Sequence, residues 1–229
     1  MAYLRKKYYY KENDIPQGLK SVYAGYDNLQ ANPLFSQLSG TIITKGTHLE
    51  NKNSIACVTK NGDIFVNTQA DLDVHEWAYA IAHNLLHLDK DKMPPEAASH
   101  PLVWNKACDI YVTRFLADIG FGKSLFQDPA KEYSIKLNDE VKIYEYLLES
   151  EGALPKQPYG LNGTHTADMI GIHSPIIYKN GDKNEYAMTF TAAITHSIKR
   201  AVSTASGHDD SKKKDSLITK AAEWFLSHY

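Results

Sequence analysis

Two histidines four residues apart, His83 and His87, are the residues of this chain whose type and spacing best suit metal chemistry. On a helix of about 3.6 residues per turn, their imidazoles lie about 40° apart around the axis and one turn apart along it. One helix can therefore offer two nitrogen ligands to a single divalent ion. The spacing alone fits equally well with two ordinary polar residues on a partly exposed helix face, so a third ligand has to decide.

Asp109 is the candidate for this third ligand. It interrupts an apolar helical pattern over residues 101–119, three positions before Val112 and seven before Leu116, so its carboxylate should face the packed side. A buried carboxylate costs free energy unless a cation or several hydrogen-bond donors meet it. A salt bridge with Arg114 or a lysine would satisfy it. Opposite a histidine pair, a His₂Asp metal site with one open position is the more economical explanation.

A predicted helix over residues 73–90 has to present the two histidines. Its apolar residues recur every three or four positions and form one stripe, and His83 and His87 lie on nearly the opposite side. Asp71 or Asp73 could cap its start. One face should therefore seat the helix, while the histidine face looks towards the second helix, which carries the carboxylate.

The chain before the histidine helix predicts a small sheet. Two β-rich runs, 55–59 and 64–67, flank a Lys-Asn-Gly-Asp sequence, and an Asn-Gly turn between such runs is a strong hairpin signal. Further predicted elements are a helix over 19–38 interrupted at Asn32-Pro33, a strand over 41–44, a helix from Pro101 to Ile119 that ends at Gly120, and a helix over 140–149. The expected fold is α+β, with a small antiparallel sheet packed on the metal-site helix and the helices that follow.

We assign residues 1–150 to one domain and residues 151–229 to a C-terminal extension. Prolines and glycines mark an irregular loop at the start of the extension. Its predicted elements are a hairpin with strands at 176–178 and 186–190, a helix over 191–202 and a last helix over 216–229. The last helix loosely resembles the one that opens the first domain, so we expect a further domain, a second copy, to follow in the parent protein.

Composition excludes several classes of function. The 229 residues include 25 basic and 27 acidic side chains, so there is no electrostatic basis for binding nucleic acid or an anionic membrane. No apolar run approaches the length of a membrane span. Two cysteines do not make a disulfide framework, and the N-terminal residues lack the apolar segment of a secretory signal. We expect a cytoplasmic protein.

Taken together, these segments resemble a family of bacterial metallopeptidase domains that accompany von Willebrand A-like domains. Members show a helix, a short sheet, an AHExxH helix and then a WNxACD helix. The corresponding segments here are NPLF at 32–35, IFVN at 64–67, AHNLLH at 82–87 and WNKACD at 104–109. The likeness covers roughly residues 19–150, and the two helix motifs together make it fairly specific.

The resemblance implies a zincin-like fold for the domain over 1–150, with a zinc ion held by His83, His87 and Asp109. It also implies a hydrolytic family whose members act on peptides or proteins, and an AAA-type ATPase as a possible partner. These properties come from the family and not from the spacing of residues in this chain.

Asn84 departs from the family at the position that matters for catalysis. The family has a glutamate there, which takes a proton from metal-bound water and passes it to the leaving amine. A side-chain amide cannot accept that proton near neutral pH, and loss of such a group removes about 10²–10⁴ in rate. We therefore expect a zinc-binding, metallopeptidase-like protein that is catalytically impaired and acts through binding or assembly.

Two alternatives stay open. The first is an active zinc-dependent hydrolase with an unconventional base. Glu76 lies about 10 Å from His83 along the helix, which suits a supporting or plain surface acid better than a base, and Asp89 points away. The remaining candidates are in the C-terminal region: His165, Asp168, His173 and His196. The second alternative is a metal-free interaction module in which both histidines form internal hydrogen bonds.

Overall fold

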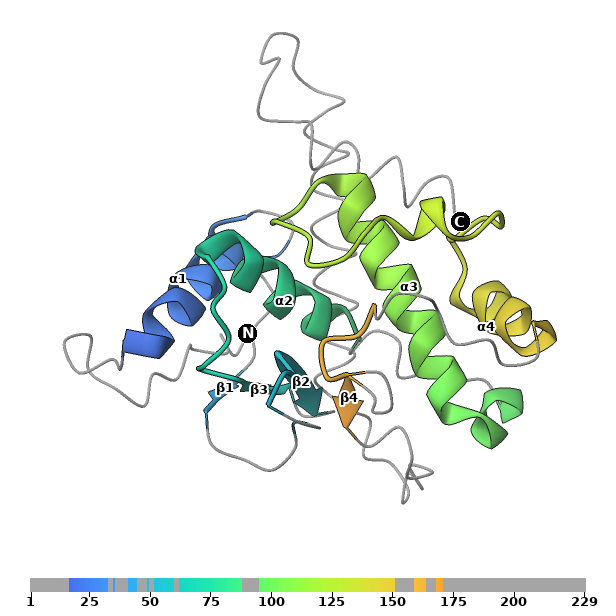
Figure 1. Ribbon diagram of the computed structural model, residues 1–229, viewed down its shortest axis with the longest axis horizontal. Coiled ribbons are helices and arrows are strands. Elements are labelled where there is room, and N and C mark those ends of the chain that lie inside the picture. Colours follow the sequence, from blue (N-terminus) through green and yellow to red (C-terminus); the bar gives the residue numbers. More distant parts are fainter. Residues whose placement is uncertain are drawn as a thin grey trace, which may run out of the picture.

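A computed structural model describes residues 17–32, 35, 41–44, 49, 52–59, 62–87, 95–150, 159–163 and 168–170 (Figure 1). The helices are α1 (Gln17–Ala31), α2 (Val74–His87), α3 (Pro101–Ile119) and α4 (Glu140–Glu149), with short 3-10 helices at Pro95–Ser99 and Pro129–Lys131. The strands are β1 (Thr41–Ile43), β2 (Ala56–Thr59), β3 (Asp63–Val66) and β4 (Met169–Ile170). In Figure 1 the strands lie together below α2, and α3 runs between α2 and α4. The α+β class expected from the sequence is confirmed.

The sheet has four strands in the order β1-β3-β2-β4. Strands β2 and β3 pair antiparallel, as the predicted hairpin requires, and Gly62 in their turn has the positive φ of 81° that favours glycine. Both outer strands, however, pair parallel to their neighbours. The expectation of a wholly antiparallel sheet was therefore wrong at its edges, because residue patterns predict strands but not the direction in which distant strands meet.

Helix α2 begins at a capping box. The Asp73 carboxylate accepts hydrogen bonds from the backbone N–H groups of His75 and Glu76, and the Glu76 carboxylate accepts one from the backbone N–H of Asp73. Of the two predicted starts, Asp73 is the right one. Lys123 forms ion pairs with both carboxylates, at 3.0 Å and 2.8 Å. Glu76 thus fixes the start of the helix.

From Trp77 to His87, every residue of α2 is buried. Helix α1 packs closely behind it at Gly25, where an added Cβ would lie 2.5 Å from Cβ of Trp77. The histidine face is also covered. The interpretation of His83 and His87 as residues on a partly exposed face was therefore wrong. Both sides of the helix are covered, and the amphipathic pattern shows only which of the two is more apolar.

Helix α3 has the predicted bounds. It ends at Gly120, whose left-handed φ of 68° lets the chain turn while backbone N–H groups bond the last carbonyls. Two apolar clusters form the interior. One gathers α1, α2, the sheet and part of α3, and the other gathers the rest of α3 and α4. Helix α3 therefore joins the two halves of the core, and Asp109 lies in the middle of it.

Residues 159–163 and 168–170, called the return segment below, come back to this core. Tyr159 packs in the α3–α4 cluster, whereas Leu161 and Met169 pack in the cluster around α2. The division of the chain after residue 150 stays a prediction. The expected hairpin over 176–190 and the helices over 191–202 and 216–229 lie outside the described residues.

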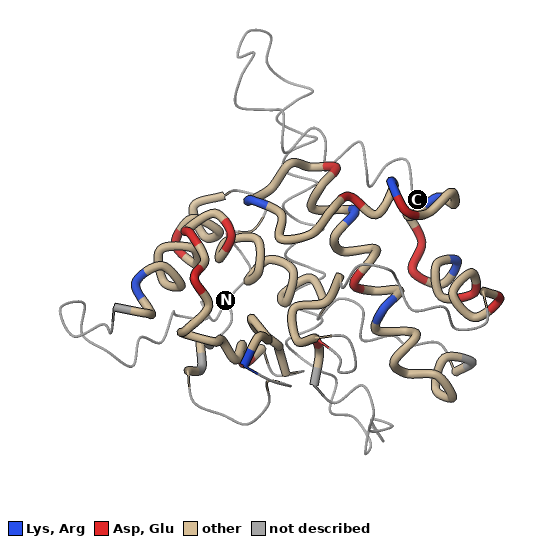
Figure 2. Tube along the Cα trace, in the orientation of Figure 1, with Lys and Arg blue, Asp and Glu red and all other residues tan. Residues whose placement is uncertain are grey.

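Charged residues of both signs are interspersed along the described trace (Figure 2), in keeping with the formal net charge of −2. Among these residues no helix combines the length and apolar character that crossing a membrane requires.

Candidate metal centre

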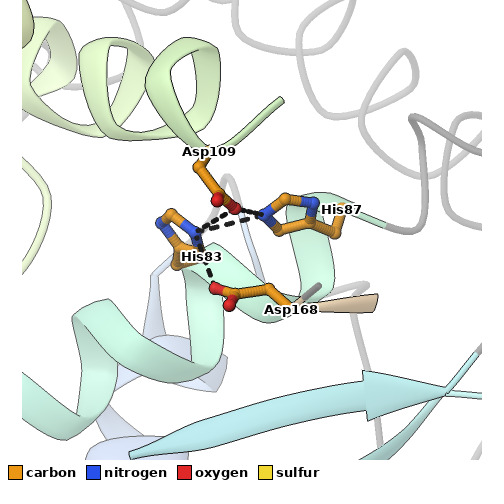
Figure 3. Close-up of side chains that lie close together, drawn as sticks. All are labelled: His83, His87, Asp109 and Asp168. Atoms are coloured by element: carbon orange, nitrogen blue, oxygen red, sulfur yellow. Dashed lines mark hydrogen bonds and ion pairs between the residues drawn. The ribbon is translucent and has the colours of Figure 1, made fainter. Parts of the chain in front are cut away.

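Helix α2 brings the two predicted histidines to one point. The Nε2 atoms of His83 and His87 lie 3.1 Å apart, and their side chains are 0% and 1% exposed (Figure 3). Because the two residues are one turn apart, a single regular helix suffices for this arrangement.

Helix α3 delivers Asp109 to the same point. Its Oδ1 lies 3.0 Å from Nε2 of His87 and 3.8 Å from Nε2 of His83, and its Oδ2 accepts a hydrogen bond from Asn105 one turn earlier. Arg114, the alternative partner considered for Asp109, instead pairs with Asp118 and with a second aspartate, Asp128. The structure thus brings together the three residues that the sequence singled out.

Asp168 is a fourth member of this group. Its Oδ2 lies 3.3 Å from Nε2 of His83, and its side chain is fully buried. The carboxylate accepts backbone hydrogen bonds from Leu161 (2.6 Å) and Asn162 (2.8 Å), which fix its position. Sequence reasoning named Asp168 only as one of several substitute bases, because a single aspartate in an irregular segment carries no spacing signal.

Gly160 allows the chain to close against both carboxylates. An added Cβ there would lie 2.8 Å from Oδ2 of Asp109 and 3.0 Å from Oδ1 of Asp168. The first approach is shorter than real Cβ contacts and the second is tighter than most of them, so a side chain at this position would have to shift the carboxylate of Asp109. Space therefore favours glycine here.

The ligand atoms of His83, His87, Asp109 and Asp168, the His₂Asp₂ cluster, all lie within 4.8 Å of one another. Zinc bonds of about 2.0–2.1 Å in a tetrahedron give ligand separations of about 3.4 Å. Four of the six separations among these atoms are 3.0, 3.1, 3.3 and 3.8 Å and bracket this value, and the other two are within 4.8 Å. The group could therefore hold a metal ion without large rearrangement.

The electrostatics of the cluster favour a bound cation. Burial lowers the pKa of the His83 imidazole, but hydrogen bonds and charges from Asp109 and Asp168 outweigh that effect and raise the pKa to about 9. Burial raises the pKa of Asp109, and hydrogen bonds from His83 and His87 hold it below its usual range. The carboxylates thus draw a positive charge into the site, and a proton on His83 competes with a metal for that role.

Two atoms of the cluster lack a hydrogen-bond partner among the described residues. They are Oδ1 of Asp109 and Nδ1 of His83, both buried. The Nε2 atoms of His87 and His83 face Oδ1 at 3.0 and 3.8 Å and donate to it only when they carry a proton, whereas a metal ion would bind all three atoms at once.

Asn84 is buried next to the cluster in sequence but is not a member of it. Its Nδ2 donates to the backbone carbonyl of Ala80, 3.0 Å away on the same helix, and its Oδ1 has no partner among the described residues. The amide is therefore tied to its own helix. Neither its chemistry nor its hydrogen bond suits a proton shuttle.

Aromatic rings cover the histidine side of the cluster. The rings of Tyr79 and Phe126 each lie 6.1 Å from the His83 ring, and Tyr159 packs 6.2 Å from Phe126. Burial raises the pKa of Tyr79 to about 12, so its hydroxyl stays protonated and donates to Thr113. These rings exclude water and lower the local dielectric.

The other candidate bases do not reach the cluster in the described part of the chain. Glu76 is committed to the start of α2 and to Lys123. Asp89, His165, His173 and His196 lie outside the described residues. Of the carboxylates and histidines considered as a replacement for the missing glutamate, the structure places Asp168 at the site.

Fold and site together define an α+β protein with a buried His₂Asp₂ group that could hold a metal ion. Comparison of the chain with protein-family models, with curated proteins and with solved structures finds no match. The resemblance to the metallopeptidase-like family stays a prediction, and so does the zincin-like fold.

Proposed function

We propose that this protein binds one zinc ion in the His₂Asp₂ cluster, in a centre related to that of zinc metallopeptidases but impaired in peptide hydrolysis. The carrying observation is the convergence of four buried ligand atoms from α2, α3 and the return segment, all within 4.8 Å. Such a protein works by binding or assembly. A peptide or protein partner, or an AAA-type ATPase, is proposed on the family resemblance alone.

The ligand chemistry supports zinc over the common hard cations. Two imidazole nitrogens and two carboxylate oxygens suit zinc, whereas calcium and magnesium prefer sites made of oxygen ligands only. Cys57 is no competitor as a ligand, because burial, with a smaller effect from Asp168, raises its thiol pKa to about 12.

The impairment rests on Asn84. An amide held by the backbone of its own helix cannot take a proton from a metal-bound water. Peptide hydrolysis also needs a proton for the leaving nitrogen, and the carboxylates considered for that step, Asp168 and Glu76, already accept backbone hydrogen bonds.

An active hydrolase is the second candidate, and the position of Asp168 is the observation that favours it. Asp168 has a carboxylate oxygen 3.3 Å from Nε2 of His83. If His83, His87 and Asp109 held the metal ion, this carboxylate could act as a base on a water bound to that ion. Both of its oxygens accept backbone hydrogen bonds, however, which orient the carboxylate as supporting groups orient a metal ligand. This favours a role as a ligand.

Metal analysis of the full chain, purified without a histidine tag, tests the proposal. We expect about one zinc per chain and a melting temperature that falls when a chelator is added. A protein that carries no metal, and whose melting temperature ignores both zinc and chelator, would refute the metal site and leave the metal-free interaction module.

A peptidase assay separates the two metal-binding candidates. We expect no hydrolysis of unstructured protein substrates by the zinc-loaded wild type, because the amide of Asn84 stands where a general base is needed. Hydrolysis by the wild type that a chelator abolishes and zinc restores would establish the hydrolase instead.

A further inference from the structure

We propose that Asp168 is a fourth protein ligand that closes the metal site, so that the ion acts as a structural clip fastening the return segment to α2 and α3. This inference rests on the proposed metal binding, and it goes beyond the His₂Asp site with one open position expected from the sequence. In this proposal the ion has a structural role and no catalytic one.

The first argument is the orientation of Asp168. Hydrogen bonds from the backbone of Leu161 and Asn162 hold its carboxylate in place, and Oδ2 faces the Nε2 atom of His83. A carboxylate oxygen has two lone pairs, so it can accept a backbone N–H and still bind a cation. Backbone donors of this kind orient a metal ligand as supporting residues do in other metal sites.

The second argument is the lack of an open coordination position. The four members of the cluster are at most 1% exposed. Catalytic zinc sites keep one position for water or substrate, whereas structural sites are filled by four protein ligands. Four buried ligand atoms within 4.8 Å of one another, with aromatic rings against His83, favour the structural kind.

The third argument is charge. Two carboxylates and two neutral imidazoles carry two negative charges in a buried volume, and one divalent cation balances them. Asp109 and Asp168 belong to segments far apart in sequence, and Gly160 lies close to both carboxylates. A divalent cation bound to both carboxylates would join the return segment to α3.

The fourth argument is the position of the other bonds that hold the segment, among them those that Ser54 Oγ and Lys106 Nζ donate to the carbonyls of Asn162 and Gly163. On the sheet side, the backbone N–H of Val58 bonds the carbonyl of Asp168, and the N–H of Ile55 bonds the carbonyl of Leu161. Strand β4 is only two residues long and pairs with β2 at the edge of the sheet. So short a strand contributes little by itself, and the ion would join it to the two helices across the core.

Cobalt substitution tests whether the site is closed. The full chain is stripped of metal, loaded with Co²⁺ and titrated with azide, while the visible absorption of the cobalt is recorded. A site with four protein ligands should give tetrahedral absorption bands that azide leaves unchanged. Bands that shift on addition of azide to the wild type would reveal an exchangeable position and overturn the proposal.

Asp168→Asn sharpens this test, because it keeps the size of the side chain and removes its charge. The variant should bind Co²⁺ at least about tenfold more weakly than the wild type and should become sensitive to azide. The matched control is Asp128→Asn, an aspartate that also accepts a backbone N–H but lies outside the cluster. Equal cobalt affinity and azide insensitivity in Asp168→Asn would exclude Asp168 as a ligand.

Hydrogen exchange tests the clip. In the zinc-loaded full chain the amides of Leu161 and Asn162 should exchange slowly, and chelation should accelerate them at least about tenfold while those of α4 stay unchanged. Unchanged exchange in the stripped protein would mean that the ion does not hold the segment. If zinc binds in that case, the proposed function stands and only the clip fails; if no metal binds at all, both fail.

Discussion

Helix α3 contributes to two groups of charged side chains, and the negative charges of the aspartates are balanced differently in each. In the arginine network, Arg114 binds Asp118 and Asp128, with side chains 27–34% exposed. In the His₂Asp₂ cluster two carboxylates are fully buried and face imidazoles. The guanidinium is always charged, whereas an imidazole is charged only when protonated.

This difference separates a structural salt bridge from a metal site. The arginine network carries its own permanent cation and remains in contact with solvent, so its charges are balanced at little cost and add little stability. The His₂Asp₂ cluster is balanced only by a proton or by a metal ion, at a depth where an unbalanced charge is expensive. Each prediction below acts on the His₂Asp₂ cluster or on the arginine network, and most of them use the other group as the control.

Removal of the metal should have the largest effect. A ligand present at 100 times its Kd stabilises the folded state by about 2.7 kcal/mol. For a chain of this length each kcal/mol shifts the melting temperature by about 2–4 °C, so chelation should lower it by about 5–10 °C. Differential scanning calorimetry with and without chelator measures this. An equal loss in a variant that already lacks Asp109 would show that the chelator acts elsewhere.

Asp109→Asn should come next. Loss of a charged ligand should weaken zinc binding at least about 100-fold, since removing a mere supporting partner costs about 10–100-fold. Competition with a chromophoric chelator measures the affinity. Asp118→Asn, on the same helix but in the arginine network, should bind zinc like the wild type. Unchanged affinity in Asp109→Asn would mean that another group supplies the third ligand.

Gly160→Ala should have an intermediate effect. The new methyl group would lie within 3.0 Å of both carboxylates and push at least one of them from its position. We expect zinc affinity to fall by about tenfold, in the range of a disturbed supporting contact. The arginine network should be untouched. A variant with full affinity would show that the return segment can retreat without moving Asp168.

Asp128→Asn should have the smallest effect. Burial raises the pKa of Asp128, but the N–H of Ala130 and the Arg114 guanidinium outweigh it and hold that pKa below the usual 3.8. A lowered pKa in the folded state gives stability that is present above the unfolded value and lost as pH falls through the folded value. Because the pair is partly exposed, this contribution is at most about 1 kcal/mol.

Urea unfolding at two pH values measures this last contribution. Asp128→Asn should be less stable than the wild type at pH 7, and the difference should shrink towards pH 3. Its zinc affinity should not change. A difference that grows as the pH falls would contradict the assigned direction of the shift.

Regular elements with a strong local signal could be predicted from the sequence. The four-residue spacing places His83 beside His87 on any α-helix, and the phase of Asp109 within an apolar helix places it inside. Helix α3 also ends where its glycine predicts. These features depend on neighbours along the chain.

The rest depends on contacts between distant segments. Asp168 lies beside a two-residue strand, too short for any periodic pattern, and it reaches the cluster only because Gly160 lets the chain pass. The parallel pairing of β1 and β4 likewise follows from where the chain crosses and returns. The burial of α2 on all sides could not be predicted either, because it depends on which distant segments pack against the helix.

The close approach at Gly25 has a consequence for how the protein would respond to a different ion. With the backbone of α1 against Trp77, helix α2 has no room to retreat, so the two imidazoles form the immobile wall of the centre. The extra radius of a larger divalent ion would have to be taken up opposite, by outward movement of β4 at the rim of the sheet. Exchanging zinc for cadmium should therefore change the pairing between β2 and β4 and leave the contact between α1 and α2 unchanged.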